Sequence, residues 1–110
     1  MTMTTVHNKL VRDRIPEIIE SSGKRCCCRT LSDQDYLSAL DQKLNEELNE
    51  YQQDKSMEEL ADLLEVIRAV ITARGSTCEQ VEAIRQAKKE KRGGFEKKIW
   101  LETVKDPSEN

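Results

Sequence analysis

Between Leu37 and Ile71 the apolar residues recur every three or four positions, which is the spacing of one face of an α-helix. The pattern is interrupted once, just after Asp54. There Ser56 is followed three residues later by Glu59, a capping-box pattern that begins a new helix. The sequence therefore predicts two long amphipathic helices joined by a very short connection.

Start and stop signals elsewhere in the chain predict two further helices. Pro16 is tolerated in a first turn and Gly23 ends a short helix, whereas Gly75 separates the third helix from the fourth. The four helices are expected over about residues 14–22, 32–54, 56–74 and 77–92. Residues 95–104 are expected as a short strand or an extended C-terminal arm, followed by a frayed end. We expect one all-α domain over residues 1–110, built as a four-helix bundle.

Length and charge exclude several classes of function. The 110 residues carry 18 basic and 21 acidic side chains, a net charge of −3, whereas nucleic-acid binding favours a basic excess. No apolar run approaches the ~20 residues of a membrane-spanning helix. The N-terminus lacks the pattern of a signal peptide, so a cytoplasmic protein is expected. The four cysteines lack zinc-site spacing, and reduced thiols are expected there.

Two acidic motifs lie on the two long helices. Glu47 and Glu50 are three residues apart, as are Glu59 and Asp62, and this spacing places each pair on one side of a helix. Four facing carboxylates repel one another unless a cation lies between them, and oxygen ligands suit Mg²⁺ or Mn²⁺. The motifs therefore predict a metal site used in phosphate chemistry.

A plainer interpretation is that these acids are surface charges of a charge-rich protein. Glu59 also has a second possible role, because a capping-box glutamate can serve the helix start alone. Two paired motifs on consecutive helices, each beside an apolar stripe, favour the metal site.

Taken together, the motifs resemble those of the all-α nucleoside triphosphate pyrophosphohydrolases, the MazG-like group. The resemblance rests on EExxE at residues 46–50 and ExxD at residues 59–62. It extends to NKLVRD at residues 8–13 and RGGFEK at residues 92–97, which look like a small single-domain branch labelled phosphoribosyl-ATP pyrophosphohydrolase-like. It covers roughly residues 8–102. The connection between the two motifs is shorter than is usual in that group.

The resemblance implies both a fold and a set of site residues. The fold would be that of an all-α pyrophosphohydrolase that forms dimers or tetramers. The metal ligands would be Glu47, Glu50, Glu59 and Asp62, and Glu46 would orient a ligand or a water. Glu46 or Glu50 could accept the proton of the attacking water.

Basic residues are needed to hold the phosphates of such a substrate. Lys9 and Arg12 are three apart near the N-terminus, and three more cations precede the double glycine at the end of the fourth helix: Lys88, Lys91 and Arg92. Each could equally be a solvated surface charge, and the second group could stabilise a helix C-terminus.

The expected function is Mg²⁺-dependent cleavage of the α–β phosphoanhydride of a nucleoside triphosphate, giving a monophosphate and pyrophosphate. The resemblance implies removal of non-canonical or surplus nucleotides. Two alternatives remain open. One is hydrolysis of phosphoribosyl-ATP in histidine biosynthesis. The other is a non-catalytic helical module that senses nucleotides or drives oligomerisation.

Overall fold

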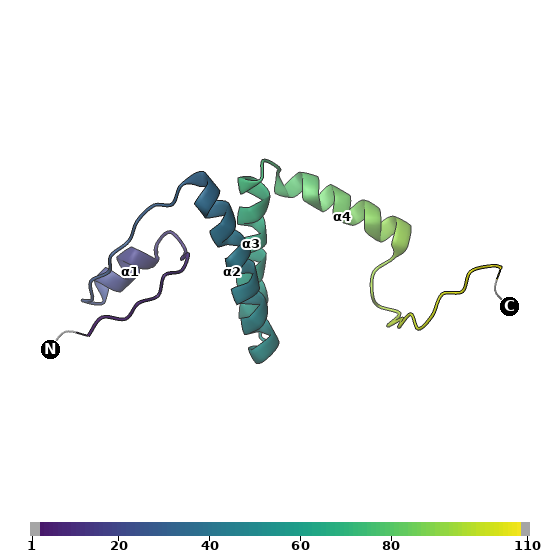
Figure 1. The fold of residues 1–110 in the computed structure, drawn as a ribbon, viewed down its shortest axis with the longest axis horizontal. Helices are drawn as coiled ribbons and strands as arrows, with labels where there is room; N and C mark the ends of the chain where they lie inside the picture. Colours follow the sequence, from purple (N-terminus) through teal and green to yellow (C-terminus); the bar gives the residue numbers. More distant parts are fainter. Residues whose placement is uncertain (1–2, 109–110) are drawn as a thin grey trace. The chain divides into compact units, whose positions relative to one another are not determined.

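The computed structural model describes residues 3–108, which contain four α-helices and no strand (Figure 1). The helices are α1 (Ile15–Ser21), α2 (Asp33–Asp54), α3 (Met57–Ala73) and α4 (Cys78–Arg92). Each lies within two residues of its expected bounds. The prediction of an all-α fold is confirmed, and no helix in the described part of the chain is long and apolar enough to cross a membrane.

The two long helices begin where serine side chains cap them. The Ser32 hydroxyl accepts a hydrogen bond from the backbone N–H of Asp35 at 3.2 Å, and Ser56 accepts one from Glu59 at 3.3 Å. Lys55 caps the C-terminal end of α2, and its left-handed backbone (φ 56°) lets its N–H donate a hydrogen bond to the carbonyl of Tyr51 at 2.7 Å. The connection between α2 and α3 is therefore only two residues long.

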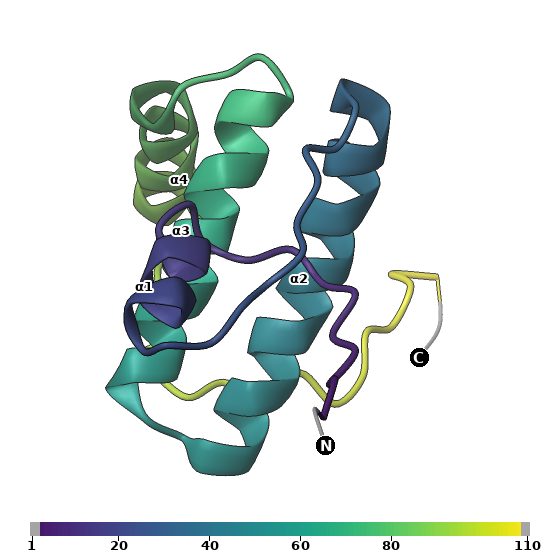
Figure 2. The same cartoon turned by 90° about the vertical axis from the view of Figure 1, so that its left-hand side faces the viewer.

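The chain divides into two units, Met1–Cys78 and Glu79–Asn110, and each is described by itself. In the first unit α2 and α3 pack side by side as a helical hairpin (Figure 2). Among the described residues, the buried apolar side chains are Leu40 of α2 and Val66 of α3, and Glu47 of α2 is also buried. This small core holds the helices that carry both acidic motifs.

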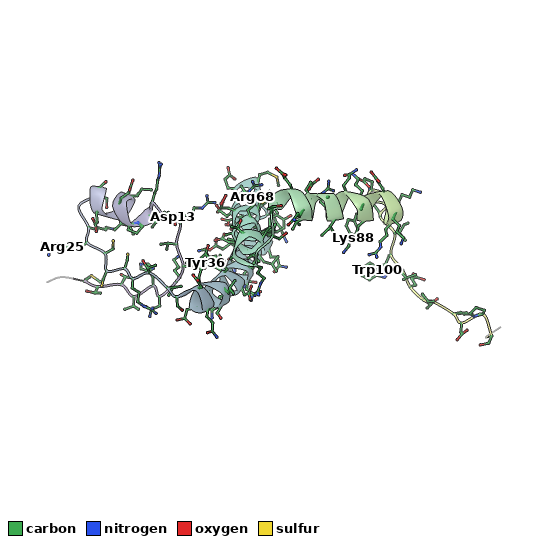
Figure 3. The ribbon with its side chains drawn as sticks, turned by 90° about the horizontal axis from the view of Figure 1, so that it is seen from above. Asp13, Arg25, Tyr36, Arg68, Lys88 and Trp100 are labelled. Atoms are coloured by element: carbon green, nitrogen blue, oxygen red, sulfur yellow. The ribbon has the colours of Figure 1, made fainter. Side chains whose placement is uncertain are left out.

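The second unit contains most of α4 and the segment that follows it. The segment has no regular secondary structure over residues 93–108, so the extended arm is observed and the alternative of a strand is not. Trp100 lies in this segment, after the α4 helix that carries Lys88 (Figure 3). Trp100 is exposed. The packing of all four helices as one bundle remains a prediction.

Candidate metal centre

Three glutamates from the two acidic motifs converge on one point of the hairpin. Glu47, Glu50 and Glu59 each offer a carboxylate oxygen, and these oxygens lie within 4.8 Å of one another. Glu47 and Glu50 are one turn apart on α2, and the two-residue connection turns the chain so that Glu59, in the first turn of α3, faces them. The structure thus brings together three of the four ligands that the sequence predicts.

Burial distinguishes this cluster from ordinary surface acids. Glu47 is only 6% exposed. Its Oε2 atom and the Oε2 atom of Glu59 are buried without a hydrogen-bond partner among the described residues. A buried carboxylate oxygen without a hydrogen-bond partner is destabilising, and such an oxygen is a suitable ligand for a divalent cation. The donor set therefore fits Mg²⁺ or Mn²⁺.

The same surroundings shift the acidity of two of the carboxyl groups. Burial, followed by the charge of Glu50, raises the pKa of Glu47, and nearby Lys43 opposes the shift. A side-chain hydrogen bond with Glu59, followed by burial and by the charge of Glu59, raises the pKa of Glu50. Both groups therefore hold their protons to a higher pH than ordinary glutamates.

The fourth predicted ligand, Asp62, lies outside this group of three. Its Oδ1 atom is 2.7 Å from the Nη2 atom of Arg12, which donates a hydrogen bond to it. Asp62 is nevertheless close enough for its charge to raise the pKa of Glu47. Its role as a metal ligand stays a prediction.

Lys43 is a site residue that the sequence analysis missed. Its Nζ atom lies 3.2 Å from Glu46 and 3.4 Å from Oε1 of Glu47, and its side chain is only 15% exposed. The spacing i, i+3 and i, i+4 from Lys43 to these two acids was the available signal. Glu46 is also 3.8 Å from Lys9, so this acid carries two cationic neighbours.

The predicted phosphate-binding residues fall into both units. Lys9 and Arg12 contact acids of the hairpin, as described above. The other three lie in the last two turns of α4, are exposed, and belong to the second unit: Lys88, Lys91 and Arg92. Their placement beside the acids stays a prediction.

A shallow hollow lies further along the hairpin, on the side of α3 that continues from Asp62 at three- and four-residue steps. Tyr36 from α2 and Arg68 from α3 contribute an aromatic ring and a guanidinium group (Figure 3). The hollow is lined by Tyr36, Glu65, Arg68, Ala69, Thr72, Ala73 and Cys78.

Comparison with known proteins does not assign a family. No family model matches the chain, and no solved structure matches it. A stretch of 42 residues, 38% of the chain, is 60% identical to an uncharacterized protein of Mycolicibacterium smegmatis and covers 43% of that protein. The matched stretch thus spans less than half of that relative's length.

Proposed function

We propose that the protein is a Mg²⁺-dependent nucleotide pyrophosphohydrolase that cleaves the α–β phosphoanhydride of a nucleoside triphosphate. The observation that carries the proposal is the convergence of Glu47, Glu50 and Glu59, with two buried carboxylate oxygens that have no hydrogen-bond partner in the described part of the chain. The resemblance of both acidic motifs and both flanking motifs to the MazG-like group supports it.

The three glutamates would hold the metal, with Asp62 as a further ligand. When bound, Mg²⁺ would supply neutralisation of phosphate charge and would lower the pKa of water. Glu50 would accept the proton of the attacking water with the carboxylate oxygen that does not hold the metal. Glu46 is the alternative base, although Lys9 and Lys43 contact it.

No covalent nucleophile is needed for this reaction, because water can attack the phosphorus directly. Cys26 is poorly suited to such a role, since burial and the neighbouring Cys28 raise the pKa of its thiol to about 11. All four cysteines are free.

Substrate binding would use the basic residues and the hollow on the hairpin. We propose that Lys9 and Arg12 bind the phosphates through charge-assisted hydrogen bonds. For Lys88, Lys91 and Arg92 of α4 the phosphate-binding role stays the expectation from the sequence. The nucleoside would lie along the hollow, and its base would stack on Tyr36, one of the lining residues.

A panel of substrates tests the proposal. We expect pyrophosphate and a nucleoside monophosphate in equal amounts from at least one nucleoside triphosphate in the presence of Mg²⁺, and none after chelation. Including phosphoribosyl-ATP in the panel distinguishes the histidine-pathway activity. Metal binding without turnover of any compound would instead favour a nucleotide sensor, and the proposed reaction would be wrong.

We propose that the protein self-associates through the first unit. Leu48 is 41% exposed and Leu64 60% exposed on the hairpin, and few apolar side chains are buried there. Exposed apolar residues of this kind favour an interface.

We expect a homodimer or larger assembly at micromolar concentration by light scattering, and dissociation in Leu64→Lys. The same charge placed at an exposed polar position, Asn45→Lys, should leave the mass unchanged, and a monomeric wild type would contradict the proposal.

A further inference from the structure

The segment before α1 bridges the two helices that carry the acidic motifs. Lys9 lies 3.8 Å from Glu46 on α2, and Arg12 lies 2.7 Å from Asp62 on α3. The N-terminal segment passes this helical hairpin before it turns into α1 (Figure 2). Two cations of one short segment thus contact acids on both helices of the hairpin.

We propose that Arg12 is a latch that competes with the metal ion for Asp62. In the metal-free protein Arg12 neutralises Asp62 and holds the N-terminal segment against the cluster. When a divalent cation binds, Asp62 turns toward it and Arg12 is released to meet the phosphates of the substrate. The inference rests on the proposed metal site and adds to it a device that couples metal binding to the phosphate-binding segment.

The position of Asp62 makes this exchange geometrically simple. Asp62 is one helical turn from Glu59 and is close enough to influence the pKa of Glu47. A change of side-chain rotamer, with no movement of the helix, could bring its carboxylate toward the three glutamates.

Exposure makes the exchange energetically easy as well. The side chains of Arg12 and Asp62 are 57% and 42% exposed, and ion pairs in such surroundings contribute little to stability. A divalent cation held by several carboxylates would therefore displace Arg12. Glu47 differs from Asp62, because it is buried and its place in the group of three glutamates does not depend on Arg12.

The hairpin provides a matched control for this latch. Arg74, directly after α3, and Asp41 of α2 form a second ion pair at 3.1 Å, with side chains 53% and 55% exposed. Asp41 lies outside the group of converging glutamates. Loss of the Arg74 guanidinium removes a similar ion pair without touching the proposed competition.

The experiment measures Mg²⁺ affinity by calorimetry for the wild type, Arg12→Ala, Arg12→Lys and Arg74→Ala. Removing the competing cation should tighten Mg²⁺ binding about two- to five-fold in Arg12→Ala, the effect of losing one exposed ion pair. Arg12→Lys should restore affinity close to that of the wild type, and Arg74→Ala should have no effect. In NMR spectra of the wild type, the Arg12 side-chain Nε–H signal should shift on addition of Mg²⁺, whereas that of Arg74 should not.

The outcomes separate the latch from the metal site itself. If the wild type and Arg12→Ala both fail to bind Mg²⁺ or Mn²⁺, the proposed function is overturned together with the latch. If Mg²⁺ binds with equal or lower affinity in Arg12→Ala, or if the Arg12 signal does not move, the metal site stands and the latch is wrong.

Discussion

Glu59→Gln should lower Mg²⁺ affinity and kcat/KM by at least about 100-fold. The substitution keeps the size of the side chain but removes one of the three converging charges. Loss of a residue that merely orients a metal ligand already costs about 10- to 100-fold in affinity or activity, so loss of a ligand should cost at least as much. Calorimetry with Mg²⁺ and a pyrophosphate-release assay on the same preparation measure the two quantities.

The neighbouring residue is a close control for this variant. Glu58 is also an acid in the first turn of α3, but it is exposed and lies outside the cluster. Glu58→Gln removes the same charge from the same helix N-terminus, where each acid contributes about 0.3–1 kcal/mol. If Glu58→Gln and Glu59→Gln reduce metal affinity equally, or if neither does, Glu59 serves only the start of the helix.

Glu47→Gln should stabilise the metal-free protein near neutral pH. The variant removes the charge of a buried carboxylate that burial and the charge of Glu50 disfavour, and we expect this relief to outweigh the lost contact with Lys43. Mg²⁺ should then raise the melting temperature of the wild type more than that of the variant. Thermal unfolding with chelator and with Mg²⁺ measures both effects.

The pH dependence of this stabilisation follows from the direction of the pKa shifts. The pKa values of Glu47 and Glu50 are raised in the folded protein, so the folded state holds protons that the unfolded state has released. Their contribution to stability is therefore fully present below the ordinary glutamate pKa and is lost as pH rises through the raised values. Without metal, these two groups should make the wild type lose stability from about pH 4 upward, more steeply than Glu47→Gln. Equal slopes for the two proteins would contradict the assignment.

Local signals in the sequence were sufficient to predict the helices. Ser32 and Ser56 cap α2 and α3 as expected, because a cap depends on residues only three positions apart. The convergence of Glu47, Glu50 and Glu59 was also predictable, since helical spacing and a short connection determine it.

The partners of the remaining site residues were not predictable in the same way. Arg12 contacts Asp62 across 50 positions of sequence, and no periodic pattern encodes an approach of that length. Lys43 was overlooked because a lysine on an amphipathic helix ordinarily faces solvent, whereas here it forms ion pairs with Glu46 and Glu47. The arrangement of α4 relative to the hairpin depends on packing that these local patterns do not specify.

The two-residue connection between α2 and α3 also affects how the site assembles during folding. The three converging glutamates lie within thirteen consecutive residues, Glu47 to Glu59, so bringing them together closes only a short loop of chain. Closing a short loop costs little entropy, and contacts that are local in sequence form quickly. The ligand cluster can therefore appear as soon as the hairpin forms, before any more distant part of the chain has found its place. Substitutions elsewhere in the chain should therefore leave this early-forming cluster in place.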